Sequence, residues 1–485
     1  MIWLLRVAPL LGLIAMGMSL LHLLPIGASQ LLGDGALPHF AVSMAINLAA
    51  GSATWLATRR FRGEIGIHEG VLLVVLVWTG GAFFAAIPLL LTVPGISFTD
   101  AFFEATSGLT ATGATVLHGL DGLPPSVNLW RGLLQWLGGM GVIVLAIAVL
   151  PMLGVGGRQL FKAEIPGPMK ADQLTPRITE TAKGLWLIYA ALTAACCLAY
   201  YAAGMSWVDA VMHSLTTLSL GGFSTHDASF GYFNSPVIES VAILFMLLAG
   251  VNFATHFVAL RGLNPVAYLR DVEVRYFVIV VGFSVLAVAS YLHLHGIFPD
   301  FTTSLRYAAF NATSVGTTTG YSTADYNLWP VFVPLWVLFL GTFLTCSGST
   351  GGGVKMIRAV VLFRQVYREF KRLAHPNAIV PLKISGQPIP VQVIFAVLAF
   401  FFMWVATTVA MTLLLTISGL DAMTAFSAVV ACLNNIGPGL QEVGPSANFS
   451  VLTNTQTWIC TFAMFLGRLE LFTLFLVFTP TFWRK

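Results

Sequence analysis

Long apolar runs, each bounded by a short polar stretch, recur along the whole chain. Ten of these runs have the length and composition of a helix that crosses a lipid bilayer. They lie at 3–27, 39–58, 71–93, 128–152, 184–204, 237–260, 276–296, 329–345, 391–417 and 457–481. The first run is longer than the apolar part of a signal peptide and no clear A-x-A cleavage site follows it, so we expect a retained helix. The pattern predicts an all-α integral membrane protein.

Four stretches between these runs share a second pattern. Each begins amphipathic, ends polar, and carries an alanine twelve residues before a final glycine. The stretches are DAFFEATSGLTATG (100–113), DAVMHSLTTLSLGG (209–222), YAAFNATSVGTTTG (307–320) and TAFSAVVACLNNIG (424–437). A single copy fits an ordinary turn or a glycine that lets two helices pack closely. Four copies in equivalent places indicate an internal repeat.

The position of each copy predicts its fold. Every copy lies between two apolar runs on the same side of the membrane, so the unit is a helix, a short re-entrant helix, a polar loop and a second helix. Irregular backbone at membrane depth is tolerated only where it is buried in protein or lines water. We therefore predict four tandem repeats around a pseudo-fourfold central pore, preceded by an N-terminal transmembrane hairpin. The expected units are the hairpin, 1–65, and pore repeats 66–155, 156–265, 266–372 and 373–485.

Composition and charge agree with this prediction and orient the chain. The sequence is 57% hydrophobic and 9% charged, against about 25% charged residues in soluble proteins, which excludes a water-soluble enzyme or nucleic-acid-binding protein. If the helices alternate, 21 of the 24 basic residues fall on one side, which predicts that this side, with both termini, is cytoplasmic. The other side carries eleven acidic and two basic residues, a surplus that concentrates cations near an opening.

The polar ends of the four stretches suit the binding of a cation that has shed its water. Backbone carbonyls replace the hydration shell when consecutive residues point them inward, and glycine permits the backbone angles that this needs. Each preceding helix also directs its negative C-terminal dipole end toward the membrane centre. The predicted selectivity filter for K⁺ consists of Thr110, Ala111, Thr112, Gly113, Ser219, Leu220, Gly221, Gly222, Thr317, Thr318, Thr319, Gly320, Asn434, Asn435, Ile436 and Gly437.

Seven motifs carry a resemblance to a known family. They are LTATGAT (109–115), WRGLLQWLGGMG (130–141), SLGGFSTHD (219–227), TTTGYSTADYN (317–327), GSTGGGVKMIR (348–358), LNNIGPGL (433–440) and GRLELFTLFLVFTPTFW (467–483). With them the chain resembles the Trk/Ktr/HKT superfamily of potassium transporters, most closely its bacterial TrkH/TrkG branch. The resemblance implies potassium uptake across the bacterial inner membrane, with K⁺ held by the four filter glycines. It also implies a homodimer in membrane lipid, bound to a cytoplasmic ring of TrkA-type nucleotide-binding subunits, with no organic cofactor in this chain. The basic loops at 158–183 and 355–385 are candidate docking sites, although positive-inside sorting alone accounts for their charge.

A second set of residues is expected to gate the pore. The run 345–355 interrupts the second helix of the third repeat with glycines and small hydroxyl residues, among them Gly348, Gly351, Gly352 and Gly353. Broken intramembrane helices often mark transport sites, and the resemblance assigns gating to this run. A packing kink is the alternative, whereas a phosphate-binding loop fails on spacing, since Val354 precedes Lys355. Arg468 lies within an apolar span, and we expect it to donate to carbonyls of 345–353.

Three further functions remain as alternatives to a gated potassium pathway. They are a K⁺ symporter coupled to H⁺ or Na⁺, a weakly selective K⁺/Na⁺ permease, and a membrane-embedded enzyme. No nucleophile with a base, metal cluster or phosphate loop supports the enzyme. Glu470 is the one carboxylate that the sequence offers as a buried proton site, which weighs against coupling to H⁺. Asp100 and Asp209, each at the start of a pore stretch, are expected to cap their helices.

Overall fold

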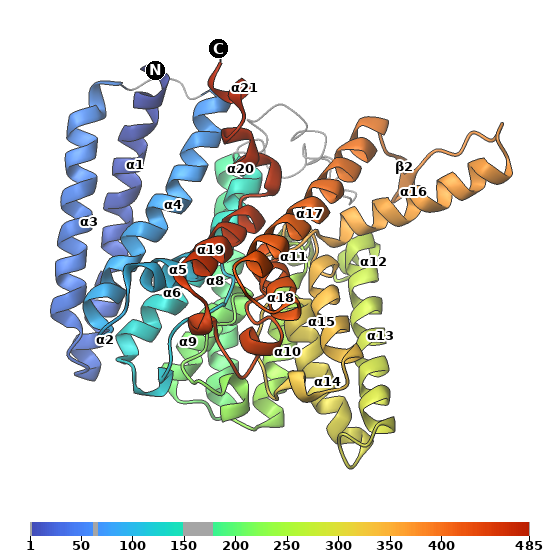
Figure 1. The fold of residues 1–485 in the computed structure, drawn as a ribbon, viewed down its shortest axis with the longest axis horizontal. Helices are drawn as coiled ribbons and strands as arrows, with labels where there is room; N and C mark the ends of the chain where they lie inside the picture. Colours follow the sequence, from blue (N-terminus) through green and yellow to red (C-terminus); the bar gives the residue numbers. More distant parts are fainter. Residues whose placement is uncertain (1, 62–65, 149–177, 485) are drawn as a thin grey trace.

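The computed structural model describes residues 2–61, 66–148 and 178–484, and these ranges are almost entirely helical (Figure 1). The chain starts with a hairpin of α1 (Ile2–Leu21), α2 (Leu23–Leu32) and α3 (Leu37–Thr58). Helices α1 and α3 touch at Gly12 and Gly51, where a Cβ on either glycine would lie within 3 Å of the other helix's backbone. Small residues thus hold the hairpin together, as is usual between helices in lipid.

Four helical repeats follow the hairpin, which confirms the predicted fold class. The first consists of α4 (Ile67–Thr92), α5 (Phe98–Leu109) and α6 (Pro125–Ala148). The second consists of α8 (Ile178–Ala202), α9 (Trp207–Leu218), α10 (Pro236–Gly250) and α11 (Phe253–Arg261). The third consists of α12 (Val266–Arg270), α13 (Val272–Leu294), α14 (Phe301–Gly316), α15 (Phe332–Phe343) and α16 (Met356–Ala374). The fourth, after the strands β1 (Lys383–Ile384) and β2 (Gln387–Pro388), consists of α17 (Val391–Ile417), α18 (Ala422–Leu433), α19 (Asn454–Arg468), α20 (Leu471–Val477) and α21 (Pro480–Trp483).

Helices α5, α9, α14 and α18 are the pore helices, and each begins at a polar cap. The caps of α5 and α9 are Ser97 and Ser206, whose side chains accept from the amides of Asp100 and Asp209. The expectation that these two aspartates are themselves the caps is therefore wrong: they lie one turn inside the helix, where a carboxylate still favours the positive dipole end. In α14 and α18 the caps are aspartates, Asp300 and Asp421.

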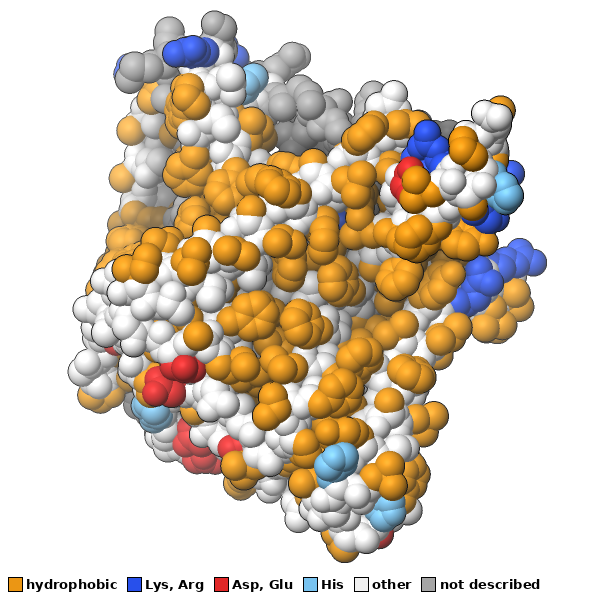
Figure 2. Space-filling model, turned by 45° about the vertical axis from the view of Figure 1, so that its right-hand side comes forward, with side chains coloured by type: hydrophobic (Ala, Val, Ile, Leu, Met, Phe, Trp, Pro, Cys, Tyr) orange, Lys and Arg blue, Asp and Glu red, His pale blue; other side chains and the backbone are white. Residues whose placement is uncertain are grey.

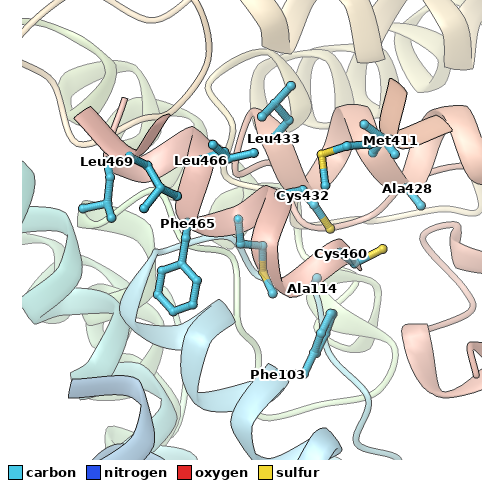
Figure 3. Packing of buried hydrophobic residues seen from close by; sticks show 14 of the residues in the cluster. Phe103, Ala114, Met411, Ala428, Cys432, Leu433, Cys460, Phe465, Leu466 and Leu469 are labelled. Carbon is cyan, nitrogen blue, oxygen red and sulfur yellow. The ribbon is translucent and has the colours of Figure 1, made fainter. Parts of the chain in front are cut away.

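The pore helices form the centre of the molecule. The alanine that each carries twelve residues before its glycine is fully buried; these are Ala101, Ala210, Ala308 and Ala425. The last repeat packs against the first and closes the ring, as Figure 3 shows with Phe103 and Ala114 beside Cys432 and Cys460. A small side chain at each buried position lets neighbouring helices approach closely around the axis.

The second helices of the second, third and fourth repeats are broken. Six described helices are long and apolar enough to cross a membrane unbroken. The predicted spans 237–260 and 457–481 are not continuous: α10 and α11 meet at 96°, and α19 and α20 at 115°. Only the break after α15 was predicted. Asn252 caps α11, and Glu470, with a positive φ of 59°, stands directly before α20, so a polar residue precedes the new helix at both breaks.

Polar and apolar side chains are segregated on the surface. Apolar side chains cover the middle of the face in Figure 2, whereas most acidic side chains on this face lie toward its lower end and lysines and arginines lie toward its upper and right-hand parts. Helix α1 begins and α21 ends at the upper end of the molecule, so the two ends of the chain lie on one side (Figure 1). Helix α16 and the β1–β2 hairpin project away from the bundle on that side (Figure 1). This distribution is that of a multi-pass membrane protein.

Candidate functional site

The four loops that follow the pore helices share one backbone conformation. Each pore helix ends directly before its loop, at Leu109, Leu218, Gly316 and Leu433. The second loop residue is left-handed in every repeat: Ala111 (φ 50°), Leu220 (φ 53°), Thr318 (φ 63°) and Asn435 (φ 53°). The amide of the third residue turns back to a carbonyl five residues earlier, with N–O distances of 2.9, 3.0, 2.8 and 2.8 Å in repeats 1 to 4. Because these amides are used by the helices, carbonyl oxygens are the backbone groups that the loops have to offer.

The final glycines of the loops form a closed ring. A Cβ built on Gly113 would lie 2.2 Å from the carbonyl oxygen of Gly221, and one on Gly222 would lie 1.8 Å from that of Thr319. The ring continues from Gly320 to Ile436 O (2.1 Å) and from Gly437 to Thr112 O (2.9 Å). All four glycines have positive φ, between 76° and 100°. Each glycine thus faces the carbonyl of the residue that precedes the glycine of the next repeat. The glycine of the fourth repeat faces the corresponding carbonyl of the first repeat, so the ring is closed.

Hydroxyl and amide side chains support these loops from behind. Thr110 and Thr112 share a hydrogen bond of 2.7 Å, and Thr317 and Thr319 share one of 2.8 Å. Asn435 Nδ2 donates to Thr112 Oγ1 at 2.8 Å, which ties the fourth loop to the first. The predicted filter residues of all four repeats therefore come together in one buried cluster.

Gln135 of α6 supports the loop of the second repeat. Its Nε2 donates to Gly221 O at 2.7 Å and its Oε1 accepts from Phe223 N at 3.0 Å. Its side chain occupies the space beside Gly221, where a Cβ would lie 2.4 Å from the amide carbon. Gln135 was not predicted from the sequence, although a polar residue within the apolar helical stretch WRGLLQWLGGMG was the available signal.

A hollow above the ring is lined by Gly113, Gly222 and Gly320 and carries the titratable group His226 at its rim. The imidazole bonds to Asp121 through Nδ1 and lies 3.3 Å from Asp209 Oδ1 through Nε2. Burial lowers the pKa of His226, but the hydrogen bonds and charges of Asp209 and Asp121 outweigh burial and leave the pKa above its usual 6.5. The protonated imidazole thus bridges two acidic side chains that belong to different repeats.

The segment between α15 and α16 lies directly beneath the four loops. Thr350 Oγ1 donates to Leu218 O at 3.0 Å, and Gly352 N donates to Thr318 Oγ1 at 2.9 Å. A Cβ on Gly352 would lie 2.0 Å from Asn434 O. The segment therefore touches the end of the second pore helix and the loops of the third and fourth repeats, and at Gly352 no side chain fits.

Arg468 binds the segment beneath the loops from one side. It ends α19, and its side chain is almost fully buried. Its Nη1 donates to Thr350 O at 2.9 Å and its Nη2 donates to Gly138 O of α6 at 2.8 Å. The guanidinium thus joins the third repeat's segment to the first repeat and brings a positive charge next to the axis.

Buried carboxylates are more numerous than the sequence suggested. Glu470 is not buried: it is 38% exposed and pairs with Arg358 at 2.8 Å. Glu104, Glu239 and Glu273 are at most 2% exposed. The first two form ion pairs across the fold, which the sequence alone could not reveal.

Glu273 holds both ends of the segment beneath the loops. Its Oε1 accepts from Ser347 N at 2.9 Å and from Ile357 N at 3.1 Å. The carboxylate lies on α13, at the start of the third repeat, and is fully buried. One side chain therefore fixes the spacing of the two ends between which the glycine-rich segment runs.

Known proteins of similar sequence and fold were compared with this chain. A family model described as TrkH, cation transport protein, matches residues 36–485. The chain is 45% identical over 477 residues to the Trk system potassium uptake protein TrkH of Salmonella typhimurium, which covers 98% of each chain. It is 36% identical over 468 residues to the Trk system potassium uptake protein TrkG of Escherichia coli, covering 96% of each.

The fold agrees with a solved structure. The crystal structure of the potassium transporter TrkH from Vibrio parahaemolyticus superposes with a TM-score of 0.91 over all of both chains, at 41% sequence identity. Sequence and fold thus give the same answer over the whole length, and the chain belongs to the TrkH family of cation transport proteins.

Proposed function

We propose that this chain takes up K⁺ across the bacterial inner membrane through a filter made by its four glycine-ended loops. The observation that carries the proposal is the closed ring in which Gly113, Gly222, Gly320 and Gly437 each face the carbonyl before the next glycine. A ring of equivalent carbonyls replaces the water around a cation from all sides. The names of the relatives, potassium uptake proteins of the Trk system, support K⁺ as the ion. The ligands in this proposal are the carbonyls of Thr110–Gly113, Ser219–Gly222, Thr317–Gly320 and Asn434–Gly437.

The segment beneath the ring, with Gly348, Gly351, Gly352 and Gly353, is the gate in this proposal. Its contacts with Leu218 O and Thr318 Oγ1 place it across the path of an ion leaving the ring. Arg468 pins the segment and repels a cation beside it. Opening then requires the segment and the guanidinium to move away together.

The proposal includes the orientation of the chain in the membrane and its partner subunits. Both ends of the chain face the cytoplasm, in agreement with the basic side chains that gather at that end of the molecule (Figure 2). The protein acts as a homodimer with TrkA-type nucleotide-binding subunits. The projecting α16 carries Arg364, Arg368, Lys371 and Arg372 on that side and is a suitable contact for them. The other candidate docking loop, 158–183, falls mostly outside the described residues.

A direct test is flux through the purified chain in liposomes of stated lipid composition. We expect K⁺ and Rb⁺ flux to exceed Na⁺ flux, and Gly113→Ser to lower the ratio, since a side chain at Gly113 meets Gly221 O. Gly119→Ser is the matched control, because Gly119 also has positive φ (65°) yet nothing lies within 4 Å of its Cβ. An unchanged K⁺/Na⁺ ratio in Gly113→Ser would count against the filter.

A K⁺ symporter coupled to H⁺ is the second candidate, because Glu273 is a fully buried carboxylate at the gate segment. Clamping the membrane potential separates the two mechanisms. A channel gives a current that reverses at the K⁺ equilibrium potential at any pH gradient. A coupled carrier shifts this reversal potential when a pH gradient is imposed, and Glu273→Gln abolishes the shift.

A further inference from the structure

Arg131 is a buried charge that touches two of the four loops. It lies on α6 and is 1% exposed, and a buried charge of this kind is stable only where other groups of the protein satisfy it. Its Nη1 donates to Ser224 O, two residues after the second repeat's glycine, at 3.1 Å. The guanidinium also lies over the ring of Phe223, 4.2 Å from the centroid. Arg131 therefore holds the backbone that leaves the ring in the second repeat.

Glu104 holds the backbone that leaves the ring in the first repeat, and it also binds Arg131. Its Oε1 accepts from Arg131 Nε at 2.9 Å. The carboxylate accepts from Val116 N and from Thr115 Oγ1, both at 3.0 Å. These two residues follow Gly113 by three and two positions. The ion pair thus fastens two neighbouring loops to each other, directly above their glycines.

The position of Glu104 recurs in the other repeats. The residue nine positions before the final glycine is Glu104, His213, Asn311 or Ala428. His213 Nε2 bonds to Ser224 Oγ at 3.0 Å, and Asn311 Nδ2 bonds to Thr323 Oγ1 at 2.9 Å, so both also hold the segment after their own glycine. Only the first repeat has a charge here, and only there does a second residue extend the contact to the next repeat.

A second arginine–glutamate pair provides a comparison. Arg306 on α14 binds Glu239 on α10 with distances of 2.8 and 2.6 Å. Its other hydrogen bond reaches Asn234, and neither residue contacts a loop at the ring. The two pairs have the same chemistry. Arg306 and Glu239 belong to neighbouring repeats, whereas Arg131 and Glu104 both belong to the first repeat and reach the second through Ser224 O. Only the Arg131–Glu104 pair touches the backbone beside the glycines.

We propose that the Arg131–Glu104 pair is a positioning element for ion selectivity, which keeps the carbonyls of the first two loops at the spacing that favours K⁺ over Na⁺. The inference rests on the proposed filter. Carbonyls that move inward by a fraction of an ångström suit the smaller ion, so a filter selects only as well as its backbone is held. Charge-assisted hydrogen bonds to buried backbone are the strongest available restraint.

The test is the K⁺/Na⁺ permeability ratio, taken from reversal potentials of the reconstituted protein. This ratio does not depend on how much protein is active. We expect Glu104→Gln and Arg131→Gln to lower the ratio about tenfold or more. The matched controls Glu239→Gln and Arg306→Gln should keep the wild-type ratio and lower only the thermal stability in detergent. If the Glu104 and Arg131 variants do not fold, Thr115→Val removes one hydrogen bond to Glu104 with little change of shape, and should lower the ratio several-fold.

The outcomes separate the two proposals. An unchanged ratio in folded Glu104→Gln or in Thr115→Val, together with a lowered ratio in Gly113→Ser, overturns the positioning role and leaves the filter intact. Unchanged ratios in all of these variants overturn the filter as well. An equal fall of the ratio in Glu239→Gln would show a general effect of loosened packing and would also overturn the inference.

Discussion

The backbone around the glycine ring has the same conformation in all four repeats, whereas the backbone beneath the ring differs from repeat to repeat. Around the ring, the four loops share one backbone conformation. In each, the second residue has a positive φ, the amide of the third residue bonds to a carbonyl of the preceding helix, and the final glycine also has a positive φ. Beneath the ring, α10 and α19 bend into their continuations by 96° and 115°, α15 gives way to the glycine-rich segment, and α6 is one helix over its described length, Pro125–Ala148. An ion on the axis needs equal ligands from every side, whereas control of flow needs only one part that moves.

Under the proposed function, each region sets a different property. If the symmetric region supplies the ligands of the ion, damage to it should change both rate and selectivity. If the asymmetric region is the gate, damage to it should change only how often the path is open.

Gly222→Ala should abolish uptake. Its Cβ would lie 1.8 Å from Thr319 O, and a φ of 76° is strained for alanine. We expect K⁺ uptake to fall at least a hundredfold, measured as Rb⁺ flux into liposomes. Gly437→Ala should be the mildest of the ring variants, because its nearest atom, Thr112 O, is 2.9 Å away.

Gly204→Ala is the matched control for the ring variants. Gly204 has a φ of 105° but open space around its Cβ, so it reports backbone strain without a clash. A Gly204 variant as inactive as Gly222→Ala would mean that strain alone explains the loss, and the ring geometry would lose its special role.

Arg468→Gln should raise basal flux while sparing selectivity. The guanidinium makes two charge-assisted hydrogen bonds, to Thr350 O and Gly138 O, each contributing about 1.5 kcal/mol or more. Losing one of them shifts the balance between closed and open forms about tenfold. Single-channel open probability and reversal potential measure the two effects separately. A changed K⁺/Na⁺ ratio with unchanged open probability would contradict the division between the regions.

Gly352→Ala should alter open probability several-fold, also without a change in ion preference. A Cβ at this position meets Asn434 O at 2.0 Å, so the segment must move away from the loops. Gly282→Ala on α13 is the control, since nothing lies within 4 Å of its Cβ. If Gly352→Ala removed ion preference instead, the segment would belong to the filter rather than to the gate.

The smallest effect is expected at His226. Its pKa lies above 6.5 because Asp209 and Asp121 outweigh the effect of burial. The bridge is therefore fully formed below pH 6.5 and is lost as the pH rises through the raised pKa of the folded protein. We expect thermal stability to fall slightly over that range, by less than about 1 kcal/mol since Asp121 is half-exposed.

His226→Gln should flatten this pH dependence. Thermal melting between pH 6 and pH 8.5 is the measurement. His213, whose ring lies 6.4 Å from that of His226, is fully buried and is a second histidine next to the bridge. A slope of the same size in His226→Gln would assign the titration to another group.

Much of the symmetric region follows from local sequence. The four stretches that end at Gly113, Gly222, Gly320 and Gly437 carry the buried alanines and the polar ends, so a short helix followed by a loop was predicted correctly for each, although the helix starts lie before the stretches. The asymmetric region was predicted only in part. The sequence TCSGSTGGGVK predicts the break after Phe343. At the breaks near Asn252 and Glu470, only a polar residue within an apolar run marks the position.

The sequence by itself determined that the chain lies in a membrane, that it repeats four times and where each repeat ends in a glycine-containing loop, because apolar periodicity and glycine placement act over a few residues. Only the tertiary structure decided which distant groups meet. Arg468 bonds to Gly138 across 330 positions, and Arg131 joins Glu104 to Ser224. Buried charges are stable only when paired, and the choice of partner depends on how the repeats pack around the axis rather than on their order in the chain.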